Sequence, residues 1–202
     1  MDKQYLKKLL VRISHHSDEE AAREFFEIFH PKLVRFAVIY TSSINNANDL
    51  VSDVFLKLFR NRSKMHEIKD IQYYLYRAVK NQCFTFLGRK NQEVSMDDIE
   101  WESFGYNYEI QNPESEFLTN ELIYEIEEII NNFPPKRKII YKMVVIDGLK
   151  YREAAEILEL SIKTIENHLS LAVKEMRSKV RDYLKSNDLN LPGTKNIKKN
   201  NF

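Results

Sequence analysis

The chain has 202 residues, of which 43% are hydrophobic and 30% charged, so it can build a core and is not a wholly disordered chain. Four glycines and five prolines argue against Gly-rich phosphate loops and turn-dense all-β folds. The single cysteine, Cys83, excludes an internal disulfide and a Cys-rich zinc site. No apolar run approaches the roughly 20 residues of a membrane span. We therefore expect a helical, soluble, cytoplasmic protein that is not inserted in a membrane and holds no metal or cofactor.

The net charge of +1 hides a segregation of charge along the chain. Residues 1–90 carry 16 basic and 10 acidic side chains, and residues 117–202 carry 15 basic and 12 acidic ones. Residues 91–116 carry eight acids, no base, and no sustained helical period. This pattern predicts two small, separately folded domains, 1–90 and 117–185, joined by an acidic linker over 91–116 and followed by a disordered tail over 186–202.

Two helices are indicated in the first half of domain 1–90. Ser17-Asp-Glu-Glu20 fits a capping box, and apolar residues follow it at helical spacing. A second helix is predicted from about Asn46 to Phe59, with one apolar stripe for the core. Its opposite face carries Asp49, Asp53, Leu56 and Arg60. This face is either an ordinary solvated surface with one exposed leucine or a surface that binds a partner.

A third helix is predicted from Asp70, its N-cap, to about Leu87. Its outer face alternates rings and cations, namely Tyr73, Arg77, Lys80 and Phe84, with Tyr76 and Asn81 at its flanks. If exposed, these side chains suit single-stranded nucleic acid, because bases stack on rings while cations track phosphates. The alternative is that Tyr73 and Phe84 pack against a neighbouring helix.

The second half of the chain predicts a helix-turn-helix. Helices from Leu118 to Ile130 and from Lys136 to about Ile146 come first, separated by Phe133-Pro134-Pro135. A short helix over 151–158 and a longer helix capped by Ser161 then follow across a tight turn. The alternative is a helical hairpin within a bundle. The turn position that usually holds glycine is Glu159, and a left-handed non-Gly residue costs on the order of 1 kcal/mol, so a different turn geometry is expected.

The outer face of the longer helix has the side-chain types that read DNA. Asn can bond adenine through two hydrogen bonds, Ser can bond several bases, Leu can contact a thymine methyl, and Glu can accept from cytosine. Lys and Arg bind phosphates and supply affinity rather than specificity. The candidate residues are Lys163, Thr164, Glu166, Asn167, Ser170, Leu171, Lys174 and Arg177.

Four stretches in this order resemble the extracytoplasmic-function (ECF) sigma factors, the two-domain members of the sigma-70 family of bacterial RNA polymerase subunits. NDLVSDVFLKLF (Asn48–Phe59) is similar to the family's core-polymerase-binding helix. YYLYRAVKNQCFTFLGRK (Tyr73–Lys90) is similar to its downstream promoter-element segment. FPPKRKIIYKMVVIDGLKYREAAEIL (Phe133–Leu158) and LSIKTIENHLSLAVKEMR (Leu160–Arg177) resemble its C-terminal helix-turn-helix region. The resemblance implies an all-α fold of two helical domains that directs core polymerase to promoters and assists DNA opening.

The resemblance also implies roles for the candidate residues. The Asp49/Asp53/Leu56/Arg60 face would dock on core polymerase. Tyr73, Arg77, Lys80, Asn81 and Phe84 would bind the −10 element, and the 163–177 set would bind the −35 element. The acidic linker would thread toward the active-site channel of polymerase. An anti-sigma factor is a further expected partner.

Two other classes of protein are weaker interpretations. The helix-turn-helix alone is shared with response-regulator output domains, but the first half lacks the alternating strands of a receiver domain. An enzyme is disfavoured because no GxxxxGK, HExxH or GxSxG motif occurs.

Overall fold

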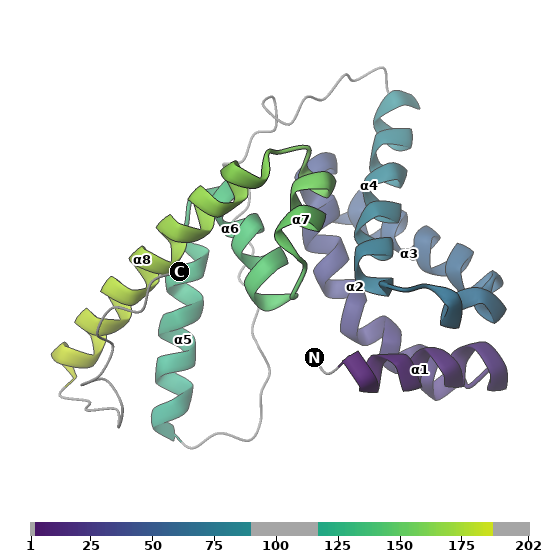
Figure 1. Ribbon diagram of the computed structural model, residues 1–202, viewed down its shortest axis with the longest axis horizontal. Helices are drawn as coiled ribbons and strands as arrows, with labels where there is room; N and C mark the ends of the chain where they lie inside the picture. The colour runs from purple at the N-terminus through teal and green to yellow at the C-terminus, as the bar shows by residue number, and fades with distance from the viewer. Residues whose placement is uncertain (1–2, 90–116, 188–202) are drawn as a thin grey trace.

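The computed structural model describes residues 3–89 and 117–187, and every regular element in these ranges is helical, as predicted (Figure 1). The first range holds α1 (Lys3–His16), α2 (Glu19–Thr41), α3 (Ile44–Arg60), the 3-10 helix η1 (Arg62–Glu67) and α4 (Ile71–Arg89). The second holds α5 (Phe117–Asn131), α6 (Pro135–Tyr141), the π-helical turn η3 (Lys142–Ile146), α7 (Tyr151–Leu158) and α8 (Ile162–Ser186). In these ranges no helix is long and apolar enough to cross a bilayer. The predicted acidic linker and C-terminal tail lie outside the described residues.

Side-chain caps set where several of these helices begin. Asp70 Oδ1 accepts from the Tyr73 N–H at 3.1 Å and Ser161 Oγ from the Thr164 N–H at 3.0 Å, as predicted. Asp18 rather than Ser17 caps α2, since its Oδ1 accepts from the Ala21 N–H at 3.0 Å. The predicted N-cap residues therefore lie within one residue of the observed ones.

The N-terminal half is built around an aromatic cluster between α2 and α3. The Phe25 ring lies 4.9 Å from the Phe29 ring and 6.0 Å from the Phe55 ring, centroid to centroid. Helix α4 packs against both α2 and α3, and α1 closes the end of the bundle against η1 and α2 through the buried Leu9 and Ile13. This three-helix core holds the outer face of α3 toward solvent.

The C-terminal half packs α5 and α6 against α8. Ile129, Ile130 and Phe133 form a small buried cluster with Ala172 of α8. An ion pair of 2.6 Å between Arg137 and Glu175 also joins α6 to α8. The helix predicted over 136–146 is interrupted, because its last turn is π-helical.

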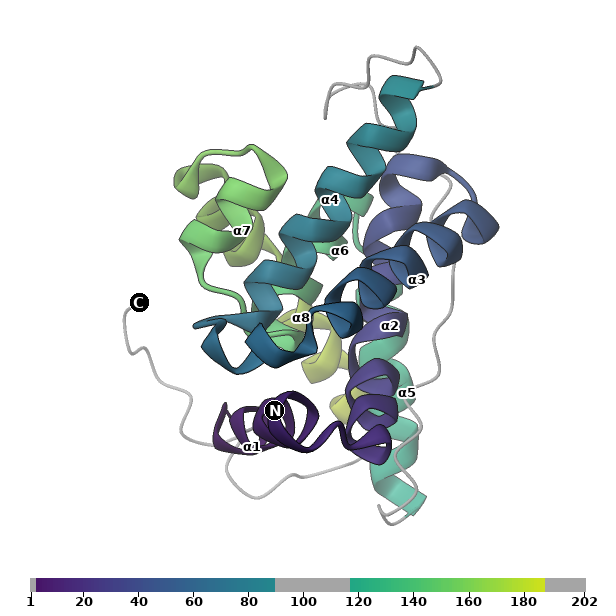
Figure 2. The ribbon, with the colours of Figure 1, turned by 90° about the vertical axis from the view of Figure 1, so that its right-hand side faces the viewer.

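The two halves also share a buried contact besides the small cluster of the C-terminal half. One continuous buried cluster includes Leu75 and Tyr76 of α4 together with Ile140, Met143 and Leu158 of the C-terminal half. Helix α7 lies beside α4 in both ribbon views (Figures 1 and 2). The two helical domains therefore also pack against each other in this arrangement, because α4 buries a second face against the helix-turn-helix.

We predict that two neighbouring residues of α3 differ sharply in their effect on stability. Phe55 is 2% exposed and Leu56 is 54% exposed. Phe55→Ala should lower the free energy of unfolding by about 3–5 kcal/mol, because it leaves a cavity in the aromatic cluster. Leu56→Ala should change it by less than about 0.5 kcal/mol. Urea denaturation of the full chain measures both values, and similar losses for the two variants would contradict this packing.

Candidate nucleic-acid interface

The helix-turn-helix has its usual turn geometry despite the glutamate in it. Glu159 has φ 55° and ψ 38°, in the left-handed region, and its N–H donates to the Ala155 carbonyl at the end of α7. Ser161 then caps α8. The expected change in turn geometry is therefore wrong, and the chain carries a left-handed glutamate where glycine would be unstrained.

The outer face of α8 presents the predicted DNA-reading side chains to solvent. All of them are exposed except Thr164, which is half-buried with its hydroxyl 2.8 Å from Ser161 Oγ. Lys163 lies 3.5 Å from Glu166, so this exposed pair contributes little to stability. A helix with amide, hydroxyl and cationic side chains on one solvated face has the form that enters a major groove.

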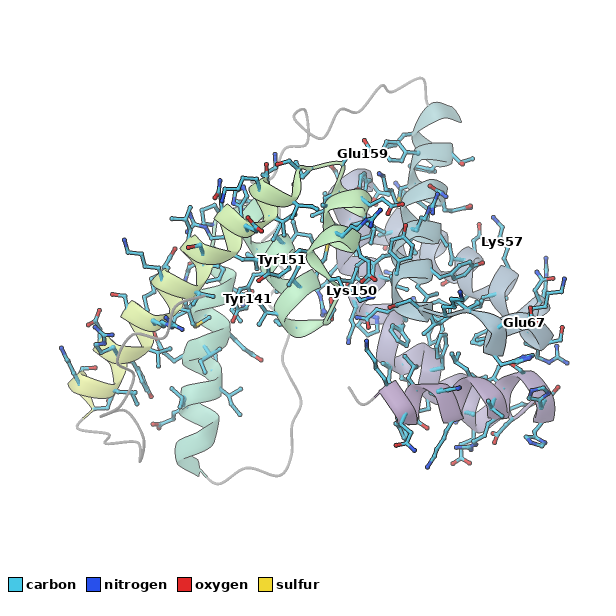
Figure 3. All side chains as sticks on the ribbon, viewed as in Figure 1. Lys57, Glu67, Tyr141, Lys150, Tyr151 and Glu159 are labelled. Atoms are coloured by element: carbon cyan, nitrogen blue, oxygen red, sulfur yellow. The ribbon has the colours of Figure 1, made fainter. Side chains whose placement is uncertain are left out.

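A groove of about 990 Å³ runs along this face of α8. Four of the predicted residues line it, together with Tyr151, Ser178 and Arg181. The four are Glu166, Ser170, Lys174 and Arg177. Tyr151 is 46% exposed at the first position of α7, on the side toward α8 (Figure 3). The prediction missed Tyr151 because the outer face was worked out on α8 alone, and only the pairing of two helices brings this ring to the groove.

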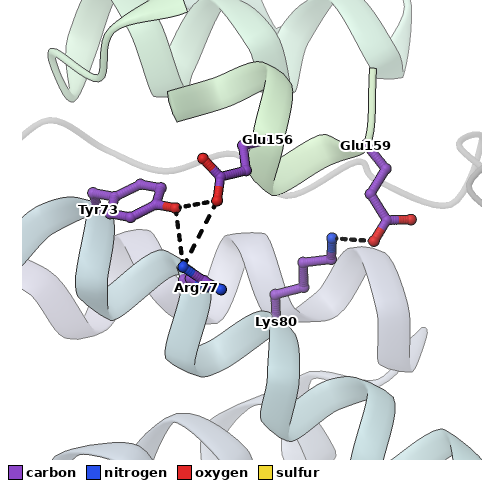
Figure 4. A network of polar contacts seen from close by, with 5 residues as sticks. All are labelled: Tyr73, Arg77, Lys80, Glu156 and Glu159. Atoms are coloured by element: carbon purple, nitrogen blue, oxygen red, sulfur yellow. Dashed lines mark hydrogen bonds and ion pairs between the residues drawn. The ribbon is translucent and has the colours of Figure 1, made fainter. Parts of the chain in front are cut away.

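The ring-and-cation face of α4 lies partly against α7. Lys80 is only 7% exposed, and its Nζ lies 2.6 Å from Glu159 Oε1. The Tyr73 hydroxyl donates to Glu156 Oε1 at 2.5 Å, and Arg77 Nη1 lies 3.7 Å from the same oxygen (Figure 4). Tyr73 and Lys80 thus contact the neighbouring helix α7 in this arrangement.

The remaining members of that face differ in exposure. Phe84 is half-buried, and its ring centroid lies 5.6 Å from that of Tyr40. Arg77 and Asn81 are exposed, with 60% of the Arg77 side chain accessible. The candidate −10 residues thus share one side of α4, and Arg77 and Asn81 are its exposed members.

A buried carboxylate, that of Asp147, joins the C-terminal half of the chain to α2 and α4. Asp147 is 8% exposed, and its Oδ2 accepts from the Tyr76 hydroxyl at 2.5 Å while its Oδ1 lies 3.3 Å from Lys32 Nζ. Gln72 also donates to the Asp147 carbonyl. Burial and the adjacent carboxylate raise the pKa of Tyr76, so the phenol stays protonated and donates. No local sequence pattern signals this role of Asp147.

The outer face of α3 is exposed as predicted at Asp49, Asp53, Leu56 and Arg60. In the described parts of the chain no group of three His, Cys, Asp or Glu residues could hold a metal ion. Cys83 is buried, and burial raises the pKa of its thiol to about 12, which keeps the thiol protonated and unreactive.

Comparison with known families decides the class of protein. Residues 25–93 match the family described as Sigma-70 region 2, and residues 123–176 match Sigma-70, region 4. Together these matches span more than half of the chain. The chain belongs to the ECF group of the sigma-70 family.

This sigma factor is similar along nearly its whole length to curated relatives. It is 25% identical to the ECF RNA polymerase sigma-E factor of Escherichia coli K12 over 191 residues, 92% of this chain and 100% of that one. It is 24% identical to the sigma-E factor of Haemophilus influenzae over 187 residues, 90% of this chain and 98% of that one. Among solved structures it is similar to the sigma factor RpoE of Bartonella quintana, crystallised with the anti-sigma factor NepR, with 19% identity, a TM-score of 0.45, and coverage of 79% of this chain and 96% of that one.

Sigma factors direct core RNA polymerase to specific promoters and assist DNA opening in transcription initiation, and this protein has that function. Its partners accordingly include core RNA polymerase and promoter DNA. The response-regulator alternative finds no support in either family match.

We predict that the stability of this sigma factor falls as the solution is acidified, partly through His168 of α8. Burial, with Lys136 and Arg137 nearby, lowers the pKa of His168 below its ordinary value near 6.5. The unfolded chain therefore binds a proton before the folded one, and the stabilising contribution present above about pH 6.5 is lost as the pH falls through the folded-state pKa.

Thermal unfolding between about pH 7.5 and pH 5.5 measures this effect. The decline of the unfolding temperature with falling pH should be shallower in His168→Gln than in the wild type. His16→Gln, at an exposed position, serves as the control. An equal decline in the wild type and His168→Gln would contradict the assignment.

Proposed function

We propose that this sigma factor divides its work among three helical surfaces. The outer face of α3 docks on core polymerase through Asp49, Asp53, Leu56 and Arg60. The covered face of α4 binds the −10 element through Tyr73, Arg77, Lys80, Asn81 and Phe84. The outer face of α8 binds the −35 element through Lys163, Thr164, Glu166, Asn167, Ser170, Leu171, Lys174 and Arg177.

The observation that carries this proposal is the solvated outer face of α8. Asn167, Ser170 and Leu171 lie along its exposed side, where base edges could reach them, and Lys174 and Arg177 are exposed farther along the same helix. Side chains that read bases are thus followed by side chains that bind phosphates, which is the division of labour that a recognition helix requires.

The −10 surface would act without covalent chemistry. A base of the non-template strand that leaves the stack gains about 1–3 kcal/mol by stacking on an aromatic ring, and the cations hold the adjacent phosphates. Binding the unpaired strand in this way favours strand separation by mass action. We therefore propose that the protein is a binding subunit and not an enzyme.

Domain boundaries and further partners complete the proposal. Residues 1–90 form the polymerase- and −10-binding domain, 91–116 the acidic linker, 117–185 the −35-binding domain, and 186–202 a tail without an assigned role. The protein acts in the cytoplasm, and an anti-sigma factor is its expected regulator by family resemblance.

We predict that substitutions of base-reading and of phosphate-binding residues of α8 have different effects on promoter binding. Asn167→Ala should cost about 1–3 kcal/mol of binding at the matched promoter and little at a mismatched one. Lys174→Ala should weaken binding to both and reduce the salt slope by about 1. Both are exposed, so neither substitution should affect folding.

The measurement is promoter binding and run-off transcription by the reconstituted holoenzyme over a salt series. Equal losses on matched and mismatched promoters for both variants would contradict the division of roles. Failure of the wild-type protein to direct promoter-specific transcripts would overturn the proposed function itself.

We predict that Leu56→Asp abolishes association with core polymerase while the chain stays folded. Leu56 is 54% exposed, with Asp53 one turn before it and Arg60 one turn after it. An acid there costs little in the free protein, where it is solvated, but is desolvated in an apolar contact. Val11→Asp, on the 36% exposed Val11 of α1, is the control. Co-purification with core polymerase and circular dichroism test this, and normal co-purification of folded Leu56→Asp would refute the docking surface.

A further inference from the structure

A pocket of about 390 Å³ lies where α1, the segment around η1 and the start of α4 meet the residues that lead into α7. Helix α1 packs against η1 there, below the start of α4 in both ribbon views (Figures 1 and 2). The C-terminal half contributes Gly148, Leu149 and Glu153 to the lining. The volume is within the range of about 300–1,000 Å³ in which proteins hold small organic ligands. Among the described residues that line the pocket, none belongs to the surfaces proposed to bind polymerase or promoter DNA.

The apolar part of the lining is aliphatic. Leu10, Ile71 and Leu149 are 5%, 3% and 4% exposed, and Leu6 and Ile68 are half-buried. No Phe, Tyr or Trp is found among the described residues of the lining, so a flat base or ring would have no aromatic side chain to stack on. Branched aliphatic side chains suit an alkyl chain, which gains free energy from the burial of each CH₂ group.

Three lysines give the pocket a positive rim. Lys3, Lys7 and Lys69 line it, and all three are exposed. Within residues 3–89 and 117–187, none of the three forms a hydrogen bond or a salt bridge. Their ammonium groups are therefore available to a ligand.

Two of the three acids in the lining already have partners. Glu153 accepts from the Lys150 N–H at 2.8 Å and its Oε1 lies 2.9 Å from Lys150 Nζ, while Asp70 Oδ1 accepts from the Tyr73 N–H. Glu67 is exposed. Three lysines against this one remaining carboxylate leave the rim positive, which suits an anionic headgroup.

We propose that this pocket binds an aliphatic anion, a molecule with an alkyl chain and one carboxylate or phosphate headgroup. The alkyl chain lies on Leu6, Leu10 and Ile71, and the headgroup pairs with Lys7 and Lys69. Because both halves of the chain line the pocket, the bound ligand contacts both and stabilises the arrangement in which they meet. This site is additional to the three promoter- and polymerase-binding surfaces.

The test is isothermal titration calorimetry of the full chain with sodium hexanoate, octanoate and decanoate, each below its micelle-forming concentration. We expect the affinity to rise about tenfold from each member of this series to the next, because two more CH₂ groups are buried. Decyl phosphate should bind as well, whereas decylammonium, with the same chain and the opposite charge, should not. Saturating decanoate should raise the unfolding temperature, since it binds the folded chain.

Paired charge variants test the rim. Lys7→Gln with Lys69→Gln removes two charges from exposed positions and should weaken decanoate binding at least about tenfold. The matched control, Lys8→Gln with Lys64→Gln, removes the same charge from exposed positions on α1 and η1 that do not line the pocket. This control should bind decanoate within about twofold of the wild type.

A third variant tests the apolar part of the lining. Leu6→Trp puts a larger side chain into the space of the alkyl chain and should abolish decanoate binding, with circular dichroism to establish that the variant is folded. Decanoate binding by folded Leu6→Trp at the wild-type affinity would contradict the assigned position of the chain.

Four further results would overturn the inference. They are an affinity that does not rise with chain length, decylammonium binding as tight as decanoate binding, an equal loss in the Lys8/Lys64 control, and binding to phosphatidylglycerol vesicles without binding of monomeric decanoate. The last result would make these lysines part of a membrane-binding surface instead of the rim of a pocket. Run-off transcription by the wild type tests the proposed function separately and depends on none of these outcomes.

Discussion

A buried carboxylate, Asp147, determines how the two halves of this sigma factor meet. Removing a carboxylate from water costs several kcal/mol unless partners compensate it, and here Tyr76 and Lys32 of the N-terminal half supply them. The loop that carries Asp147 is therefore fixed against α2 and α4. Because α7 begins at Tyr151, four residues later, it must lie along α4 as well. The cover over the ring-and-cation face follows from this one anchor.

The three proposed binding surfaces differ in their accessibility in this arrangement. The outer faces of α3 and α8 are exposed, while on α4 Lys80 is buried and Tyr73 and Phe84 are half-buried. The proposed docking surface for polymerase is thus accessible in the free protein, whereas the proposed −10 surface is only partly accessible. Promoter contacts that are each weak gain affinity when a large partner holds them at a fixed separation, since the second contact then forms at high effective concentration.

The features predicted correctly depend on the spacing of residues along one helix. The features that were missed depend on contacts between segments far apart in the chain. The apolar stripe of α3 and the cap at Ser161 predicted their helices and outer faces, because spacing along one helix is a local property. Rings and cations on α4, by contrast, suit a nucleic acid and an acidic helix equally well. The partners of Lys80 and Tyr76 lie 79 and 71 residues away along the chain, and no local pattern signals such a pairing. For the −10 candidates, the sequence thus predicted the shared face but left open whether a neighbouring helix packs against it.

The central claim is that the two halves are closed in the free protein and separated on polymerase. Spin labels at Thr85→Cys on α4 and Lys185→Cys on α8, both exposed positions, report this directly by pulsed dipolar spectroscopy. The native Cys83 is buried, and burial raises the pKa of its thiol to about 12, so it resists labelling. A single well-defined distance in the free protein that changes on addition of core polymerase is the result expected. An identical distance distribution with and without polymerase would contradict the claim.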